Sequence, residues 1–238
     1  MGDESIREAG LRPFAHNGRA TLYRSRSLDN VGRHGVAQLR ELGIAEVFDL
    51  RKPHEQRTNP LLAEAGIRVR SLDENLQDGP LLRLRPNAMT VRERYGAPGE
   101  RMQLMYRTFA FRAQAFLPAV RAAAASPRPV LIHCQNGKDR SGVVCACVKR
   151  VLGDDLSSIE ADYLGTNREN AAMNMRDLAR LSTELDCEEL AIVRSMFEAR
   201  KDYLDTFWLE LEARYGSFEN FMASSPAACL PETALVAC

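Results

Sequence analysis

Residues 129–142, with the sequence PVLIHCQNGKDRSG, decide the fold of this 238-residue chain. The short apolar run at 129–133 predicts a buried strand, and residues 141–152 predict a buried helix that Gly153 ends. The residues between them are polar and include one glycine, which is typical of a tight loop. A strand, a loop and a helix in this order indicate an α/β sheet.

The flanking segments continue the alternation of strands and helices. We expect strands at 20–25, 45–50 and 67–72, the last near a sheet edge, and a helix at 29–42. A long helix over 100–125, bent near Pro118, comes next. Further helices are predicted at 155–164, 170–181, 188–197 and 199–215. The fold class is therefore α/β, with a central, mainly parallel sheet flanked by helices and a helical C-terminal half.

The chain length fits one generous domain or two small ones, and we expect a single domain over residues 1–238. Residues 75–99 are rich in proline, glycine and arginine, and we expect this segment to be a helical lid insertion. Its arginines could contact acidic substrates or a membrane surface, or form the wet face of lid helices; they are Arg83, Arg85, Arg92 and Arg94. Residues 223–238 are predicted to be a loose tail.

Composition narrows the class of protein. Lysine plus arginine balance aspartate plus glutamate at 32 each, so no global charge favours a nucleic-acid partner. The apolar runs are too short for a transmembrane segment, and residues 1–8 carry no secretory signal. The six cysteines include no Cys-x-x-Cys pair, so we expect no metal site and no cofactor. The predicted location is the cytoplasm, with export without a leader as the alternative, and nothing in the sequence sets the oligomeric state.

The loop between the predicted strand and helix suits phosphate chemistry. Cys134 follows the strand and therefore faces the crevice where α/β sheets bind ligands. Backbone N–H groups of the loop and the helix N-terminus would stabilise a thiolate there, which could attack phosphorus. Arg140 offers a planar fork to two phosphoryl oxygens, Gly137 suits unusual backbone angles, and Ser141 could donate its hydroxyl to the thiolate. The predicted phosphate-binding residues are Gln135, Asn136, Gly137, Lys138, Asp139 and Arg140.

Residues 133–142 resemble the signature loop of the protein tyrosine phosphatase superfamily. The form His-Cys-x-x-Gly-Lys-Asp-Arg-Ser/Thr-Gly is similar to that of atypical bacterial tyrosine phosphatases that also hydrolyse phosphoinositides. Further stretches that fit are 22–25, 48–51 with Glu55 after it, 162–164 and 215–217, so the resemblance spans about 20–222. It implies a phosphotyrosine-phosphatase-like domain with a helical lid, no metal, and phosphoryl transfer in two steps through Cys134.

The leaving oxygen needs a proton donor. Many tyrosine phosphatases place an aspartate about thirty residues before the cysteine, but no aspartate lies between Asp78 and Asp139. The resemblance implies that Asp49 is the acid; the alternative is that it caps a turn or pairs with Arg51. Asp139 is the second candidate, and it could instead brace the loop. Asp73 and Asp78 are weaker candidates beside the insertion.

Four other side chains near the motif have two interpretations or a supporting role. His133 is expected to hold the loop through hydrogen bonds. Lys138 adds a cation that favours multiply charged head groups, unless it is simply solvated. Cys145 and Cys147 are predicted to be small core side chains, with a redox partnership with Cys134 as the alternative.

We therefore expect a cysteine-dependent protein tyrosine phosphatase of broad specificity. Its substrates would be phosphorylated proteins, at phosphotyrosine and also phosphoserine or phosphothreonine, and phosphoinositides. The alternatives are a phosphoinositide-selective lipid phosphatase, an arsenate reductase, and a non-catalytic phosphate-binding module. Arsenate reduction needs further redox cysteines, and no suitably placed pair is evident. Loss of Cys134 or Arg140 would favour the binding module, and both are present.

Overall fold

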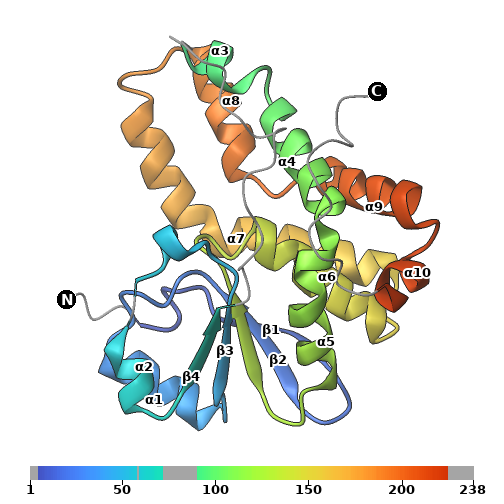
Figure 1. Cartoon of the computed structure of the whole chain (residues 1–238). Helices are drawn as coiled ribbons and strands as arrows, with labels where there is room; N and C mark the ends of the chain where they lie inside the picture. Colours follow the sequence, from blue (N-terminus) through green and yellow to red (C-terminus); the bar gives the residue numbers. More distant parts are fainter. Residues whose placement is uncertain (1–4, 58, 72–89, 225–238) are drawn as a thin grey trace.

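The computed structural model describes residues 5–57, 59–71 and 90–224 (Figure 1). Five strands form one sheet in the order β1-β2-β5-β3-β4. They are Arg12–His16 (β1), Thr21–Ser25 (β2), Glu46–Asp49 (β3), Arg68–Ser71 (β4) and Val130–His133 (β5). Strands β2, β5, β3 and β4 run parallel, and β1 pairs antiparallel with β2. The predicted mainly parallel sheet is therefore confirmed.

Strand β5 lies at the centre of the sheet and is buried on both faces. Val130 and Ile132 belong to one apolar cluster, while Leu131 between them belongs to the other. This is the alternation expected when successive side chains of a strand point to opposite faces. A strand that is covered on both faces has a continuous run of apolar residues in its sequence, and residues 129–133 show such a run.

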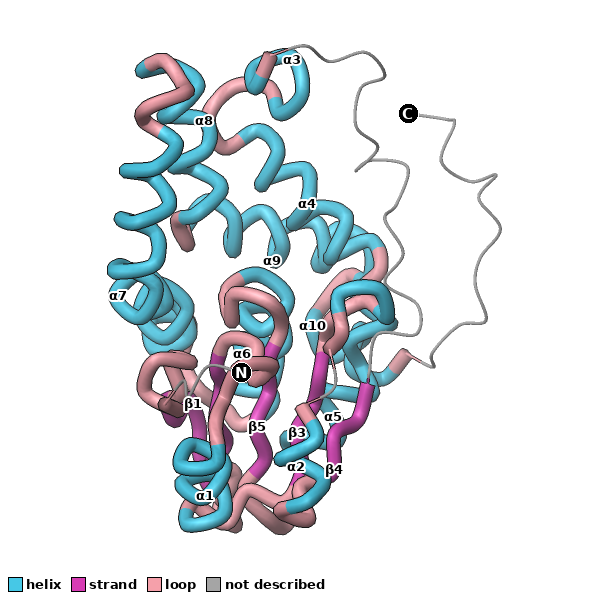
Figure 2. The backbone as a smooth tube through the Cα atoms, turned by 90° about the vertical axis from the view of Figure 1, so that its left-hand side faces the viewer, coloured by secondary structure: helices cyan, strands magenta, loops and turns pink. Residues whose placement is uncertain are grey.

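Helices cover the two faces of the sheet (Figure 2). Helices α1 (Arg33–Glu41) and α2 (Pro60–Glu64) supply Val36, Leu39 and Leu62 to the cluster around Leu131. On the other face lie α5 (Leu117–Ala125) and α6 (Asp139–Val151). The sheet and these helices form the part of the molecule that carries the motif.

A helical region stands above the carboxyl ends of the parallel strands (Figure 1). Its elements are α3 (Val91–Tyr95), α4 (Glu100–Phe111), α7 (Leu156–Leu181), α8 (Cys187–Phe197), α9 (Lys201–Tyr215) and α10 (Phe218–Ala223). Helix α9 packs along α4, and Tyr106, Phe109 and Phe207 from these two helices join the larger core cluster. The predicted helical C-terminal half is confirmed. It covers the carboxyl ends of the parallel strands, where the motif lies.

Several predicted boundaries were wrong. The helix expected over 100–125 is divided into α4, a 3₁₀ turn at Ala113–Phe116 (η3) and α5. Pro118 lies in the first turn of α5, where a missing N–H costs nothing, so it begins a helix instead of bending one. The two helices expected over 155–181 are the single helix α7. Strand β1 and the short helices α2 and α10 were not predicted.

The expected lid insertion at 75–99 is described only from residue 90 onward. There, α3 lies beside α8: the N–H of Val91 donates to Glu189 Oε1 at 3.3 Å, and Arg92 pairs with Glu188. Most of the predicted tail at 223–238, together with Asp73, Asp78, Arg83 and Arg85, lies outside the described residues. The lid and the single-domain assignment stay predictions. Within the described ranges, no helix is long and apolar enough to cross a membrane.

Phe207 tests the packing of α9 into the larger core cluster, because its ring is fully buried there and lies edge-on to Trp208, with 5.1 Å between ring centres. We expect Phe207→Ala to lower the free energy of unfolding by about 3–5 kcal/mol, since it leaves a cavity in the core. Leu209→Ala is the control on the same helix, because that side chain is 70% exposed; its effect should stay within about 0.5 kcal/mol. Urea unfolding measures both, and equal losses would contradict this packing.

Candidate active site

The motif lies where three parallel strands end at the same level. His133, the last residue of β5, is in register with Ser25 at the end of β2 and with Asp49 at the end of β3. The N–H of Leu50 donates to the His133 carbonyl at 2.9 Å and extends this alignment by one residue. Residues 134–138, here called the Cys134 loop, then turn back, and α6 begins at Asp139.

The carbonyl groups of the Cys134 loop are bonded to groups outside it. The donors are Ser27 N to Gln135 O (3.1 Å), Asn170 Nδ2 to Asn136 O (3.0 Å) and Arg24 Nη2 to Gly137 O (2.7 Å). In a planar trans peptide the N–H points away from the preceding carbonyl, so the N–H groups of 136–138 face the inside of the loop. In the described chain none of these N–H groups donates to a protein acceptor. The loop is thus a nest for an anion, with the start of α6 beside it.

Gly137 is required at its position for two reasons. Its φ of +61° lies in the left-handed region that favours glycine. A Cβ atom there would lie 2.5 Å from the backbone oxygen of Ser25, closer than real contacts allow. The glycine therefore lets the loop pass directly over the end of β2.

A buried ion-pair network supports the loop from behind. Arg24 is 1% exposed and, besides holding the Gly137 carbonyl, donates from Nη1 to Asp162 Oδ2 at 2.6 Å. The other carboxylate oxygen of Asp162 accepts from Arg12. Strands β1 and β2, helix α7 and the Cys134 loop are joined in this way. Each buried charge has an opposite charge in contact, as burial requires.

Arg140 is held in a fixed orientation by Glu55. Its Nη1 and Nη2 donate to the two carboxylate oxygens at 2.5 and 3.0 Å, and Nη1 also donates to the carbonyl of Leu50 at 3.1 Å. Burial disfavours the charged form of Glu55, but the hydrogen bonds from Arg140 and from the Lys52 backbone outweigh burial, so its pKa lies below the ordinary value. A bidentate pair of this kind pre-orients the guanidinium plane.

Asp49 pairs with Arg51, which was the alternative to its role as the acid. Its carboxylate is 3% exposed, and both oxygens accept from the Arg51 guanidinium, at 2.9–3.2 Å. Arg51 also donates to both oxygens of Asp29. Burial alone would lower the pKa of Arg51, but the bonds to Asp49 and Asp29 outweigh burial and raise it above the ordinary value. Asp49 is thus ion-paired with Arg51 in this structure, and its expected role as the acid stays a prediction.

His133 lies between this cluster and the nucleophile. Its Nε2 is 3.7 Å from Asp49 Oδ2, and its Nδ1 is 3.2 Å from the Cys134 carbonyl. Burial lowers the pKa of His133 below its ordinary value, so the ring is neutral at pH 7. The side chain of Cys134 is 3% exposed at the start of the loop.

The side chains of Asp139 and Lys138 lie at the start of α6 and differ in exposure and in partners. Asp139 is the more accessible carboxylate, with its side chain 21% exposed, and its Oδ1 accepts from the hydroxyl of Tyr106 at 3.0 Å. Lys138 is buried, and its Nζ donates to the carbonyls of Met196 and Glu198 and lies 3.3 Å from Asp139 Oδ1. An ammonium has three donors, and these three partners account for them. The side chain therefore points to the helical region, which differs from the predicted substrate contact, while its backbone N–H faces the loop interior.

Three further side chains on α6 are buried. Ser141 is fully buried, and its Oγ has no hydrogen-bond partner in the described part of the chain. Its expected hydrogen bond to the thiolate stays a prediction. Cys145 and Cys147 lie in the core, as predicted. Burial raises the pKa of Cys145 to about 12 and that of Cys147 further, so both thiols stay protonated at neutral pH. The redox partnership stays a prediction.

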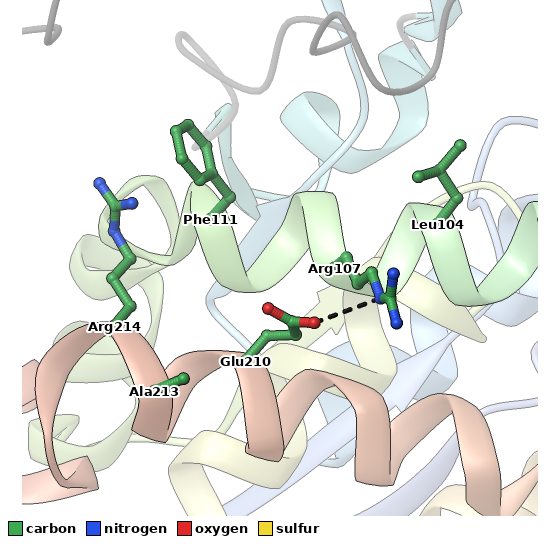
Figure 3. Close-up of a pocket in the computed structure, with 6 residues that line it drawn as sticks. All are labelled: Leu104, Arg107, Phe111, Glu210, Ala213 and Arg214. Atoms are coloured by element: carbon green, nitrogen blue, oxygen red, sulfur yellow. Dashed lines mark ion pairs between the residues drawn. The ribbon is translucent and has the colours of Figure 1, made fainter. Parts of the chain in front are cut away.

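A second pocket lies in the helical region, away from the Cys134 loop. Figure 3 shows a pocket of about 440 Å³ between α4 and α9, lined by Leu104, Arg107, Phe111, Glu210, Ala213 and Arg214. Both of its cations are engaged, because Arg107 pairs with Glu210 at 3.2 Å and Arg214 lies 4.3 Å from the Phe111 ring centre. Among the described residues, no cluster of His, Cys, Asp and Glu could hold a metal ion. The candidate site is therefore the Cys134 loop.

The residues that hold the loop were not assigned this role from the sequence. Arg24, Glu55 and Asp162 stood in stretches that resembled the family, but their partners could not be known. Asn170, Tyr106 and Met196 had no local signal, because each reaches the loop or Asp139 from a helix that is distant in the sequence.

Comparisons with known proteins identify the family of the chain. The model of the tyrosine phosphatase family matches residues 7–227. The triple specificity protein phosphatase PtpB of Mycobacterium tuberculosis is 32% identical over 231 residues, which cover 84% of each chain. A putative tyrosine-protein phosphatase of Cupriavidus necator is 28% identical over 204 residues, covering 84% of this chain and 72% of that protein. The solved Siw14 catalytic core is 17% identical with a TM-score of 0.41, over 81% of this chain and 94% of its own.

The family model spans far more than half of the chain, including both the Cys134 loop and the helices that anchor it. The resemblance that residues 133–142 suggested is therefore confirmed. This protein is a phosphatase that belongs to the tyrosine phosphatase family.

Proposed function

We propose that the enzyme hydrolyses phosphomonoesters through a phospho-cysteine on Cys134. The observation that carries this proposal is the nest of inward N–H groups at the Cys134 loop, closed by Arg140 in the orientation set by Glu55. Such a site binds the three non-bridging oxygens of a phosphoryl group and neutralises charge that develops on them in the transition state. A thiolate nucleophile works only while it is reduced, which favours the cytoplasm over export without a leader.

The reaction has two steps in this proposal. The Cys134 thiolate forms a bond to phosphorus while the bond to the ester oxygen breaks, and Asp139 gives its proton to that leaving oxygen. Water then attacks the thiophosphate, the Asp139 carboxylate takes a proton from the water, and phosphate and the thiolate are released. Ser141, whose hydroxyl has no partner among the described residues, would donate to the sulfur as it leaves.

Asp139 replaces Asp49 as the proposed proton donor because of where each carboxylate lies. Both oxygens of Asp49 accept from Arg51, whereas Oδ2 of Asp139 has no protein partner among the described residues. Asp139 also precedes Arg140 directly and is the first residue of α6, next to the loop that would hold the phosphoryl group. A general acid must reach the proton acceptor before its other properties matter.

We propose broad specificity, over phosphotyrosine, phosphoserine or phosphothreonine, and phosphoinositides. One relative is named a triple specificity phosphatase. The inward N–H groups of the loop would contact phosphoryl oxygens, which all these esters share. The alternative, a phosphoinositide-selective phosphatase, depended on Lys138 as an extra cation for the head group. In this arrangement its Nζ is bonded to Met196 and Glu198, which favours the broad class.

Replacement of the nucleophile tests the mechanism. Without added metal, we expect the wild type to release phosphate from p-nitrophenyl phosphate and Cys134→Ser to lose about 10³-fold or more of that rate. Rapid denaturation during turnover should show a phosphoryl mass increment on the peptide that contains Cys134. Cys187→Ser is the control, since that cysteine is exposed at the start of α8. Undiminished turnover by Cys134→Ser would refute the assignment.

The two aspartates can be separated by leaving-group dependence. Asp139→Asn should lower kcat for phenyl phosphate about 100-fold, but much less for p-nitrophenyl phosphate, whose leaving group departs without a proton. Asp49→Asn should weaken both reactions by the same factor and lower stability, because it breaks a buried ion pair. The measurement is kcat for each ester. A selective loss in Asp49→Asn alone would return the acid role to Asp49.

Substrate breadth needs a panel of a phosphotyrosine peptide, a phosphoserine peptide, and mono- and bis-phosphorylated inositides. We expect turnover in each class, and Lys138→Met should reduce turnover of the phosphotyrosine peptide and of the bis-phosphorylated inositide by the same factor. Lys201→Met is a matched control, because its side chain is 58% exposed at the start of α9. Turnover of inositides alone, with a selective loss in Lys138→Met, would support the lipid-selective alternative.

A further inference from the structure

Two buried tyrosines lie behind Asp139. Tyr106 comes from α4 and Tyr163 from α7, and neither ring is exposed to solvent. The Tyr106 hydroxyl is 3.0 Å from Asp139 Oδ1 and 2.7 Å from the hydroxyl of Tyr163. The two helices therefore present a chain of hydroxyl groups that ends on the carboxylate of the proposed acid.

The direction of these hydrogen bonds follows from counting protons. An ionised carboxylate only accepts, so Tyr106 donates its single proton to Asp139. The Tyr163 hydroxyl must then donate to the oxygen of Tyr106. Burial, together with the negative charge of Asp139, raises the pKa of Tyr106 well above its ordinary value, and burial raises that of Tyr163 as well. Both hydroxyls therefore keep their protons at neutral pH, and each bond polarises the next.

This arrangement distinguishes the two oxygens of Asp139. Oδ1 receives Tyr106 and lies 3.3 Å from the Lys138 ammonium. Oδ2 has no hydrogen-bond partner among the residues that the structure describes. When the carboxyl group is protonated, the proton must sit on Oδ2, because Oδ1 already faces two donors. Oδ1 can keep accepting from Tyr106 in both states, so the side chain need not turn during the reaction.

We propose that Tyr106 and Tyr163 are positioning residues that fix the Asp139 carboxyl group so that Oδ2 carries the catalytic proton. This inference rests on the proposed role of Asp139 as the general acid. In the first step the Oδ2–H bond breaks and its proton goes to the leaving oxygen as sulfur bonds to phosphorus. In the second step Oδ2 takes a proton from the attacking water. Neither tyrosine gains or loses a proton over the cycle.

Removal of the donor hydroxyl tests the proposal. Tyr106→Phe should lower kcat for phenyl phosphate about fivefold, the effect of one hydrogen bond, at unchanged KM and with p-nitrophenyl phosphate turnover nearly unchanged. Tyr163→Phe should act in the same direction but less, because Tyr106 can still donate to Asp139. In Tyr106→Phe the buried hydroxyl of Tyr163 loses its acceptor on Tyr106, whereas the double variant Tyr106→Phe/Tyr163→Phe removes both hydroxyls. The double variant therefore separates the effect on Asp139 from a folding defect.

Tyr203→Phe is the matched control. Its ring centre lies 5.8 Å from that of Tyr106 in the same buried cluster, but its hydroxyl donates to the Ser195 carbonyl and has no contact with Asp139. We expect its ratio of phenyl to p-nitrophenyl phosphate turnover to match the wild type. Thermal unfolding of each variant confirms that the compared enzymes are folded.

The outcomes separate this inference from the function on which it rests. In an Asp139→Asn background, Tyr106→Phe should have no further effect on the phenyl to p-nitrophenyl ratio. If Asp139→Asn itself leaves that ratio unchanged, the proposed acid is wrong. If Asp139→Asn changes the ratio while Tyr106→Phe behaves like Tyr203→Phe, the acid stands and the positioning role is overturned. An equal loss on both esters in Tyr106→Phe would also overturn it, because that result indicates packing alone.

Discussion

The hydrogen bond from the buried guanidinium of Arg24 to the carbonyl of Gly137 is the interaction on which the site depends. A carbonyl that is turned outward and held there leaves the adjacent N–H groups facing inward, which is what an anion needs. The bond is possible only because Asp162 on α7 neutralises Arg24 and because Gly137 has no side chain to collide with β2. Charge pairing behind the loop thus determines the polarity of its inner surface.

A second buried arginine, Arg51, holds the site in place on the other side of β5. Arg51 gathers Asp29, Asp49 and the carbonyl of Glu55, and Glu55 in turn orients Arg140. The reactive loop therefore lies between two fixed arginines, one reached from β2 and one from the end of β3. Neither guanidinium is available to a substrate, since each is only 1–2% exposed. Their contribution is rigidity, and a preorganised site loses little free energy to rearrangement when charge develops.

Much of this architecture could be predicted from the sequence, for reasons that particular residues show. The run at 130–132 is buried on both faces, so it reads as a strand without any partner being known, and the loop that follows has a residue pattern with few other uses. What could not be predicted depended on contacts between distant segments. The sequence places Asp49 after an apolar strand, but Asp29, which shares Arg51 with it, lies twenty residues earlier, so the buried cluster of these three residues had no local signal. The carbonyls of Met196 and Glu198 that accept from Lys138 lie about sixty residues after it in the chain, so they too had no local signal. Strand β1 was also not predicted; it lies at the edge of the sheet and pairs with β2 alone.

The anchors of the loop have a consequence for anyone who would engineer this chemistry. Ten residues carry the signature, but its carbonyls and its lysine are held by β2 and the residues just after it, by Asn170 on α7, and by the end of α8 with the turn that follows. Transplanting the ten residues onto another strand and helix would transfer the reactive side chains without the groups that turn the peptide planes. A graft of that kind should keep a cysteine and an arginine at the right spacing and still bind no anion. The smallest portable unit is the loop together with its three distant supports.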